Sequence, residues 1–351
     1  MKDLSYIPIL PKHLGDLKSH SRNTLCDIQR SVEYLISAGK FKYRNPITVC
    51  GSTAGEQTDY QVLIELNSTN FDFNLPQTNG EDIRFTDSDG NLLDYWIESW
   101  DKLNETAKIW VKVPSIPASP DKTEIFMYYG NPSVSSASDG DATFEFFDDF
   151  SVDTTGNYDL FLYDAGYLNY DSTNQRVRVG TPGDGSSNYM TALHSSQMFS
   201  ENVIIQTTIE AYQFGDGAWS QGGIIVEEEE EARPELSDTN DGYQLVVDQG
   251  GTIIFQKFTG GAITAIDSIS IPATPFILKI GRSGDTYYAY VNDTLITSDS
   301  SLGLTADLHT PFHTRVNWES NRDMWLDVDN FIIRKYTSPE PTILIGTMEE
   351  P

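Results

Sequence analysis

Apolar and polar residues alternate with a period of two along most of the chain. The clearest runs in the first half are 59–66, 82–85, 95–100 and 107–116, with Gly, Pro, Asn and Asp between them. Alternation bounded by turn-forming residues is typical of short strands in a half-buried antiparallel sheet. The pattern therefore predicts a first β-sandwich over residues 41–140.

The second half of the chain repeats this pattern after a small-residue linker at 133–141. Short strands separated by turns indicate a second antiparallel sandwich of the jelly-roll type, which we assign to residues 141–351. The predicted fold class is all-β, with two antiparallel β-sandwiches and a short N-terminal α-helical segment. The most regular segments of the second half are 203–209, 222–226, 242–247, 252–255, 276–280, 286–291 and 326–334.

Residues 1–40 follow a different, helical pattern that predicts a short helix ending near Gly39. A single helix of this length needs a partner that covers its apolar side. The partner is either the chain's own sandwich or another protein, in which case 1–40 is a docking or oligomerisation segment. The apolar stripe consists of Leu25, Ile28, Val32 and Leu35.

The chain is strongly acidic, with 52 Asp and Glu against 23 Lys and Arg among 351 residues and a formal net charge of −29. It would repel phosphate, which excludes nucleic acid and disfavours anionic lipid surfaces. Such a surface is typical of halophiles, or of proteins that must resist self-association. Cys26 and Cys50 lack metal-binding spacing, and we expect two unpaired thiols.

The sequence also bears on membranes and export. No run approaches the roughly 20 apolar residues that span a bilayer, so we expect no membrane insertion. Residues 1–16 contain Pro8 and Pro11 and lack the apolar centre of a signal peptide. We therefore expect a route to the surface other than signal-peptide secretion, such as assembly into a virus particle.

Five blocks of the first predicted sandwich carry a family resemblance. They are FKYRNPITV at 41–49, DYQVLIEL at 59–66, NGEDIRFTDSDGNLLDYWIE at 79–98, AKIWVKVPSI at 107–116 and EIFMYYGNP at 124–132. This region resembles the uncharacterised domain family found beside laminin-G-like modules in archaeal and bacterial surface proteins. The resemblance implies a β-sandwich placed at a surface, and it implies no particular chemistry.

Softer blocks carry a second resemblance. They are WSQGGIIVE at 219–227, NDGYQLVVD at 240–248, ILKIGRSGDTYYAYVNDTLI at 277–296 and LDVDNFIIR at 326–334. This half of the chain resembles concanavalin-A-like, laminin-G-like domains. The resemblance implies that sugars or proteins bind at rim loops or on the concave face, and that calcium binds on the convex face.

Four aspartates are candidate calcium ligands. Asp148 and Asp149 open the second predicted sandwich, and Asp327 and Asp329 alternate on its last strand. In lectin-like sandwiches the first and last strands are neighbours, so these carboxylates should converge. Converging carboxylates repel one another unless a hard cation such as calcium neutralises them. The alternative is that the aspartates cap turns and keep the surface soluble.

Aromatic and polar residues of the second sandwich are candidates for sugar binding. An aromatic ring stacks on the apolar face of a sugar while amide and guanidinium groups bond its hydroxyls. For each aromatic residue the alternative is packing in the core, to which we assign Trp96, Trp100 and Trp110 of the first sandwich. The candidates are Trp219, Tyr243, Trp318, Asn321, Arg322 and Trp325.

No catalytic motif stands out. Glycoside hydrolysis needs two carboxyl groups at defined separations. Laminarinase-type enzymes carry Glu-x-Asp-x-x-Glu on one strand, whereas residues 327–330 read Asp-Val-Asp-Asn and lack both glutamates. We therefore predict that the protein is not an enzyme.

Together these features predict a non-catalytic adhesion or carbohydrate-recognition protein displayed at a surface. We expect a virion turret, decoration or tail receptor-binding subunit of an archaeal or bacterial virus, and otherwise an extracellular or cell-surface protein. The expected partners are a host-surface glycan or glycoprotein, further copies of the chain, and other virion proteins through residues 1–40. The alternatives are a purely structural spacer and a glycoside-acting enzyme.

Overall fold

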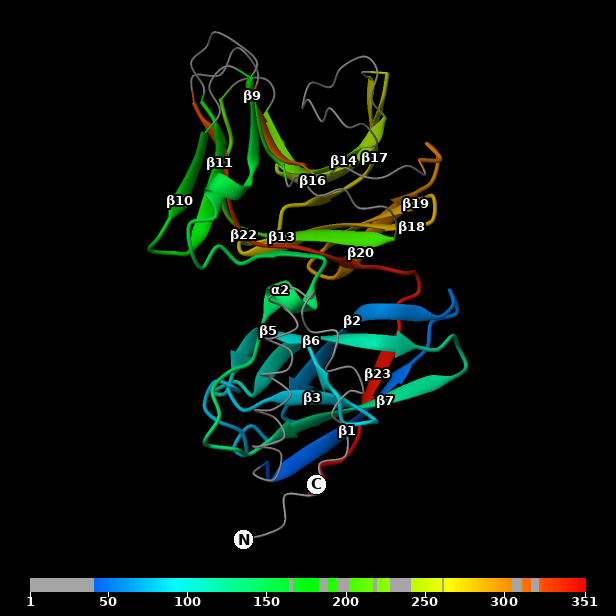
Figure 1. Cartoon of the computed structure of the whole chain (residues 1–351). Coiled ribbons are helices and arrows are strands. Elements are labelled where there is room, and N and C mark those ends of the chain that lie inside the picture. Colours follow the sequence, from blue (N-terminus) through cyan, green and yellow to red (C-terminus); the bar gives the residue numbers. More distant parts are fainter. Residues whose placement is uncertain are drawn as a thin grey trace, which may run out of the picture.

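The period-two alternation forms strands throughout the described part of the chain, and the predicted all-β fold is confirmed (Figure 1). The computed structural model describes residues 41–163, 167–182, 189–194, 202–216, 220–227, 241–260, 262–304, 311–316 and 322–351. The predicted helix in 1–40 lies outside them. Within these ranges helical structure is limited to α2 (Gly140–Thr143) and the 3₁₀ turn η2 (Thr155–Asn157), and no helix is long and apolar enough to cross a membrane.

The first sandwich consists of a five-stranded and a three-stranded antiparallel sheet. The five-stranded sheet has the order β23 (Thr342–Ile345), β1 (Tyr43–Cys50), β7 (Lys122–Tyr129), β3 (Arg84–Asp87) and β4 (Leu92–Leu93). The three-stranded sheet has the order β2 (Gln57–Asn67), β6 (Thr106–Ile116) and β5 (Tyr95–Asp101). As the alternation predicts, Tyr60, Val62, Ile64 and Leu66 of β2 enter the core between the sheets.

The second sandwich is larger and has eight strands in one sheet and seven in the other. The first sheet has the order β10 (Tyr167–Asp171), β11 (Arg176–Thr181), β22 (Met324–Lys335), β13 (Val203–Gln213), β18 (Phe276–Ser283), β19 (Thr286–Val291) and β20 (Thr294–Asp299), and β8 (Phe146–Asp148) also pairs with β22. The second sheet has the order β17 (Ala262–Ser270), β16 (Thr252–Thr259), β15 (Gly242–Asp248), β14 (Ser220–Glu227), β21 (Pro311–Val316), β12 (Tyr189–His194) and β9 (Asp159–Tyr163).

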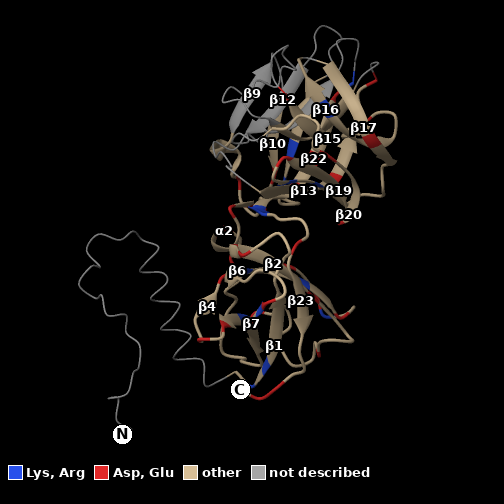
Figure 2. Cartoon of the chain, turned by 90° about the vertical axis from the view of Figure 1, so that its right-hand side faces the viewer, with Lys and Arg blue, Asp and Glu red and all other residues tan. Residues whose placement is uncertain are grey.

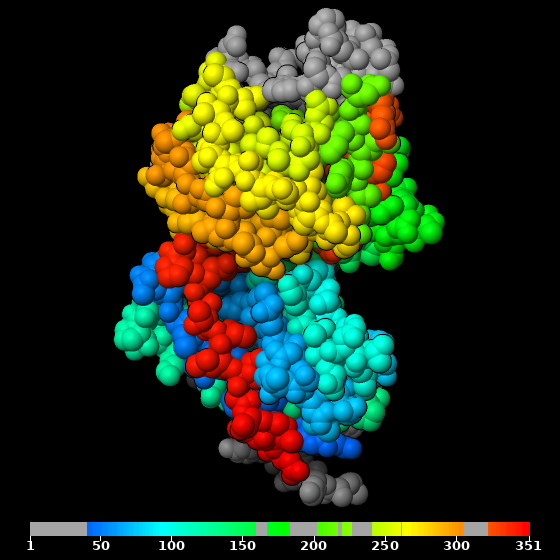
Figure 3. All heavy atoms as spheres, turned by 180° about the vertical axis from the view of Figure 1, so that it is seen from behind, coloured from blue at the N-terminus to red at the C-terminus, as the bar shows by residue number. Residues whose placement is uncertain are grey.

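The last strand of the chain does not belong to the second sandwich. Strand β23 pairs with β1, with Ile345 opposite Ile47. Figure 3 shows this C-terminal segment running down from the upper sandwich along the lower one. The second sandwich is therefore inserted between β7 and β23 of the first, and the sequence-based boundary of 141–351 placed β23 in the other domain.

The two sandwiches meet at an apolar contact that we call the joint. Its buried residues are Trp96 and Trp110 from the first sandwich, Phe144 beside α2, and Ile332 from β22. Trp96 and Trp110 are therefore interior residues, as expected, but they fill the space between the sandwiches rather than the first core. Helix α2 lies between the two sandwiches in Figure 1.

Polar bonds surround the joint. Arg334 is fully buried and pairs with Glu340 through two bonds of 2.7 and 3.1 Å, while its guanidinium lies 4.6 Å from the centre of the Trp110 ring. The hydroxyl of Tyr60 donates to the same Glu340 carboxylate at 2.7 Å. Burial raises the pKa of Glu340, but the charge of Arg334 and the hydrogen bonds from Arg334 and Tyr60 together outweigh it, so the net pKa is lowered.

A second bridge across the joint is more exposed. Lys279 of the second sandwich forms a salt bridge with Asp293, and Lys108 of the first sandwich reaches the same carboxylate at 3.3 Å. Asp and Glu residues are spread over both sandwiches (Figure 2), so these two lysines reduce the repulsion between carboxylates near the joint. The joint therefore combines apolar burial with ion pairs that cross from one sandwich to the other.

Candidate functional site

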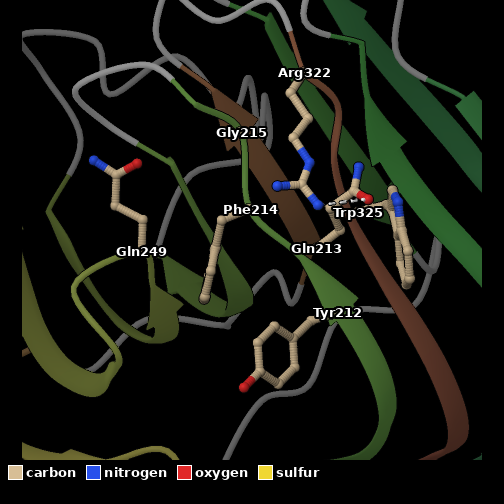
Figure 4. Close-up of a pocket in the computed structure, with 7 residues that line it drawn as sticks. All are labelled: Tyr212, Gln213, Phe214, Gly215, Gln249, Arg322 and Trp325. Carbon is tan, nitrogen blue, oxygen red and sulfur yellow. Dashed lines mark hydrogen bonds between the residues drawn. The ribbon is translucent and has the colours of Figure 1, made fainter.

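A hollow of about 400 Å³, which we call the rim pocket, opens at one end of the second sandwich. Its lining comes from three places: the end of β13 and the residues after it, the turn between β15 and β16, and the start of β22 (Figure 4). Both sheets therefore contribute to it. The described residues that line it are Tyr212, Gln213, Phe214, Gly215, Gln249, Arg322 and Trp325.

Gln213 helps to position the guanidinium of Arg322 at the rim pocket. Its side-chain oxygen accepts a bond of 3.2 Å from the guanidinium of Arg322, and its amide nitrogen donates to the backbone oxygen of Asp323 at 3.0 Å. The carboxylate of Asp323 accepts a bond from Tyr167 at 3.3 Å. Burial first, and this carboxylate second, raise the pKa of Tyr167 to about 12, so its hydroxyl stays a donor at neutral pH.

Aromatic rings supply the apolar part of the lining. The rings of Tyr212 and Phe214 lie 5.1 Å apart, below Arg322 in Figure 4, and both pack against the core of the sandwich. Trp325 lies opposite Gln213 in the β13–β22 pairing, and the Arg178 guanidinium stacks on its ring at 3.6 Å. The pocket thus places flat apolar surfaces next to hydrogen-bonding groups.

Asp327 holds the arginine that supports Trp325. Two bonds of 2.6 and 2.9 Å join its carboxylate to Arg178, and Arg176 adds a contact of 3.0 Å. These bonds raise the pKa of Arg178. The side chain of Asp327 is buried, and two guanidinium groups balance its charge.

The other three predicted calcium ligands lie on the neighbouring strands β8 and β22 or directly after β8. Strand β8 pairs with β22 and places Asp148 opposite Phe331, so the first and last strands are neighbours, as expected. The negative charges of Glu210, Asp149 and Asp148 repel the charge of Asp329. Burial and, after it, these carboxylates raise the pKa of Asp329 to about 6.

The aspartates of this acidic corner already have hydrogen-bond partners. Asp148 already accepts bonds from the backbone of Phe150 and the hydroxyls of Thr154 and Tyr158, at 2.9, 2.6 and 2.6 Å. Asp149 caps the turn that follows it through Ser151. Among the residues that the structure describes, no group of three or more His, Cys, Asp or Glu side chains is arranged to hold a metal ion.

The predicted sugar-binding residues have three different positions. Arg322 and Trp325 both line the rim pocket. Tyr243 lies in the core, where its ring stacks on Tyr287 at 4.4 Å and its hydroxyl bonds Asp299 at 2.8 Å, so no ring face is open to a ligand. The remaining candidates, Trp219, Trp318 and Asn321, lie outside the described residues.

Sequence reasoning missed Tyr212, Gln213, Phe214 and Gln249. Tyr212 and Gln213 end β13, and Phe214 follows just before Gly215. Gln249 lies in a tight turn before two glycines. Polar and aromatic residues at a strand end are a weak signal on their own. The pairing of β13 with β22 places Gln213 opposite Trp325, and Gln249 reaches the same pocket from the turn between β15 and β16.

The comparisons with known proteins concern both halves of the chain. Residues 79–159 match a family described as a domain of unknown function, DUF2341, which overlaps the region resembling an uncharacterised family. No curated protein matches the chain. Among solved structures, a carbohydrate-binding module, CBM66 from Bacillus subtilis, is similar at 18% identity, 51% coverage of this chain, 96% of the module and a TM-score of 0.34.

Two further solved structures are similar over a comparable share of the chain. The catalytic domain of an endo-1,3-β-glucanase (laminarinase) from Thermotoga petrophila RKU-1 has 9% identity and a TM-score of 0.41, covering 55% of this chain and 97% of its own. A protein from a study of O-glycanases of the human gut microbiota has 11% identity and a TM-score of 0.44, covering 55% and 100%. With all these TM-scores below 0.5, nothing about this chain's chemistry follows from them.

Proposed function

We propose that the chain is a carbohydrate-recognition protein that binds a saccharide in the rim pocket without cleaving it. The observation that carries the proposal is the convergence of aromatic and polar side chains on one open hollow. Trp325 and Tyr212 offer apolar faces to a sugar ring, and Gln249 and Arg322 offer groups that bond hydroxyls. A volume of about 400 Å³ falls in the range of small-ligand sites.

The lining also supports a non-catalytic role. Glycoside hydrolysis uses two carboxyl groups about 5 Å or roughly 6.5–9.5 Å apart. None of the described residues that line the rim pocket is acidic. The same groups can therefore hold a saccharide, but they lack the acid and the base or nucleophile that would break it.

The test begins with a glycan array probed with the full chain, followed by calorimetry on the best oligosaccharide. We expect Trp325→Ala to weaken binding at least about tenfold, because it removes the stacking face. Trp325→Phe should weaken binding less, and Leu103→Ala, which changes an exposed side chain of the first sandwich, should leave it unchanged. Thermal unfolding of each variant checks that it folds.

Two results would count against this function. Binding by Trp325→Ala with the affinity of the unchanged protein would remove the rim pocket from the proposal. Release of shorter oligosaccharides from the bound glycan, followed by chromatography, would contradict the non-catalytic part.

The joint favours a second candidate function, that of a structural spacer. Buried tryptophans and the Arg334–Glu340 pair fix one sandwich on the other, and a spacer requires such a fixed arrangement. The two candidates are not exclusive. A protein that binds no glycan on the array but keeps both sandwiches in one cooperative unit would support the spacer alone.

Display on a virion or cell surface is a further part of our proposal, and it comes from the sequence. Residues 1–40, the proposed docking segment, lie outside the described residues. The measurement that tests this step is the native mass of the full chain and of a variant that lacks 1–40. We expect a homo-oligomer for the full chain and a monomer for the shortened one.

A further inference from the structure

A second hollow, which we call the end pocket, lies at one end of the first sandwich and has a volume of about 500 Å³. Strands β2 and β23 end beside it and β6 begins there, so both sheets of the sandwich contribute to it. Its apolar lining includes Phe71, Tyr129 and Ile345. Two carboxylates, those of Asp72 and Glu105, belong to the same lining. The end pocket therefore suits a lysine side chain, which has an apolar stem and a charged end.

Hydrogen bonds hold the lining of the end pocket in place. The hydroxyl of Tyr129 donates to the side-chain oxygen of Asn45 at 2.6 Å, and the Asn45 amide donates to the backbone oxygen of Gly346 at 2.8 Å. The backbone and side-chain amides of Asn74 donate to one oxygen of Asp72, at 2.9 and 3.0 Å. Burial first, and the charge of Asp72 second, raise the pKa of Tyr129, so this carboxylate lies near the ring. The site is therefore largely formed before a ligand binds, which lowers the cost of binding.

The strand beside the end pocket has a free edge. Strand β23 is the outermost strand of its sheet and pairs with β1, and no strand in the described part of the chain pairs with its other side. The Gly346 N–H donates to the backbone oxygen of Pro46 at 2.7 Å and thus faces β1. This direction alternates in an antiparallel pair, so the main-chain groups of Ile343 and Ile345 point away from β1. Such an edge, next to the exposed side chain of Leu344, can accept a further strand.

Residues 1–40 differ in charge from the rest of the chain. They contain six Lys and Arg against four Asp and Glu, a net charge of +2, whereas residues 41–351 contain 17 against 48. They join the first sandwich beside the end pocket, because the N–H of Lys42 donates to the backbone oxygen of Tyr129 at 3.2 Å and Tyr129 lines the pocket. A basic segment of 40 residues is therefore attached next to an acidic pocket, to which the same segment of another copy is attracted.

The charges argue against a simpler pairing of two copies. Strand β23 of one copy could pair with β23 of another through their free edges. This would bring two copies of one acidic surface together, because Glu349 and Glu350 follow the strand and two carboxylates line the pocket beside it. Like charges that face each other across an interface repel, so the basic segment is the better occupant.

Within residues 1–40, the stretch 2–7 fits both the strand edge and the pocket. It ends before Pro8, which has no N–H to donate to a neighbouring strand. In an extended strand the side chains of Lys2, Leu4 and Tyr6 point to one side. A single stretch can therefore pair with β23 through its main chain and place one lysine and two apolar side chains against the end pocket.

We infer that residues 2–7 of a second copy of the chain dock at the end pocket, where they pair with the free edge of β23 and place Lys2 beside Asp72 and Glu105. The main-chain bonds supply affinity, and the side chains that enter the pocket fix the register of the added strand. This inference rests on the assembly role proposed for residues 1–40 and does not depend on saccharide binding.

Sedimentation of the full chain over a range of concentrations tests the docking. We expect an oligomer whose dissociation constant rises about tenfold or more in the double variant Asp72→Asn/Glu105→Gln, because both partners of Lys2 lose their charge. Added salt should also weaken the unchanged oligomer. The control Glu56→Gln/Asp89→Asn removes two exposed carboxylates of the same sandwich and should leave the dissociation constant unchanged. Thermal unfolding checks that each variant folds.

A charge exchange tests the contact itself. Lys2→Glu and Glu105→Lys should each raise the dissociation constant about tenfold or more, since each places like charges together. In an equimolar mixture of the two variants, the altered segment of one chain meets the altered pocket of the other, and the two unaltered partners also meet. We expect the mixture to recover most of the affinity of the unchanged chain. Recovery requires docking between two copies, because a segment docked on its own chain cannot produce it.

The outcomes separate this inference from the proposed function. A monomeric full chain, or an oligomer that survives removal of residues 1–40, would end both the docking and the assembly role. An oligomer that is lost on that removal but unchanged in Asp72→Asn/Glu105→Gln and in Lys2→Glu would overturn the end pocket while the assembly role stands. A mixture that stays dissociated would overturn the contact between Lys2 and Glu105. Saccharide binding, measured on the same variants, should not change in any of them.

Discussion

Arginine meets tryptophan at two places along the outer face of β22, and the two places differ in their surroundings. At the joint, Arg334 lies 4.6 Å from the Trp110 ring, is fully buried and is held by Glu340. At the rim pocket, Arg178 lies 3.6 Å from the Trp325 ring, and Arg322 stands exposed beside them. An arginine stacked on a tryptophan holds the two sandwiches together at the joint, where other residues bury it. At the rim pocket, the same kind of pair lies beside an open hollow that can hold a ligand.

The largest expected effect is at the joint, where Arg334→Ala leaves Glu340 and Tyr60 without their cation. Removing one partner of a buried ion pair costs about 3–5 kcal/mol of unfolding free energy, and the partial exposure of the Glu340 side chain places this pair near the lower end of that range. We expect a loss of this size in urea unfolding, with no change in saccharide binding. Arg44→Ala is the matched control, since its pair with Glu349 is exposed, and it should cost less than about 1 kcal/mol. Equal losses in the two variants would show that the joint is not held as described.

A smaller effect is expected at Tyr243, the predicted sugar contact that lies in the core. Tyr243→Phe removes its bond of 2.8 Å to the Asp299 carboxylate, and bonds to charged groups contribute about 1.5–3 kcal/mol. Unfolding measurements should show a loss near the lower end of that range, with unchanged saccharide binding. A loss of affinity without a loss of stability would place Tyr243 in the binding site instead.

The contribution of the acidic corner to stability should change with pH in the opposite direction to that of the joint. The pKa of Asp329 is raised to about 6, so the stability it contributes is present near pH 4 and is lost as pH rises through 6. The lowered pKa of Glu340 has the reverse effect, because its contribution is lost as pH falls below about 4.5.

The variant Asp329→Asn tests whether Asp329 destabilises the fold when it is ionised. Since the side chain is partly exposed, we expect the variant to gain about 1 kcal/mol over the unchanged protein at pH 7 and nothing at pH 4, by urea unfolding at both pH values. The same samples test the calcium prediction. If millimolar calcium raises the melting temperature of the unchanged protein and not of the variant, the corner is a cation site, as the sequence predicts.

The smallest expected effect is at the exposed bridge of the joint. Lys108→Met removes the contact of 3.3 Å with Asp293, which Lys279 still neutralises. Half-exposed ion pairs contribute less than about 1 kcal/mol, and salt weakens them. We expect a loss below that value in low salt that disappears in about 1 M salt. A larger, salt-independent loss would mean that Lys108 acts through packing.

Much of the fold could be predicted from the sequence because the signal is local. Alternation along 59–66 is enough to place Tyr60 and Leu66 in a core, whatever the strand's neighbours. Strand β23 could not be assigned in this way. Its four residues look like any short strand, and its pairing with β1 depends on how the chain returns after the whole second sandwich.

The candidate site, like the fold, could be predicted where the signal is local and not where it depends on strand pairing. A polar patch between tryptophans pointed to Arg322 and Trp325, and both line the rim pocket. Gln213 and Gln249, which line the same pocket, are distant from them in sequence. The β13–β22 register places Gln213, and the turn between β15 and β16 places Gln249. The sequence predicted that Asp327 would join the other aspartates. Its pairing with Arg178 on β11 could not be predicted, because no local pattern shows which strand lies beside β22.

The return of β23 has a mechanical consequence. Because the second sandwich is inserted between β7 and β23, a force applied to the chain before β1 and after β23 passes through their mutual pairing. The second sandwich, although it lies between these points in sequence, stays out of the load path. A tether that pulls on the first sandwich would therefore leave the pocket at the far rim unstretched.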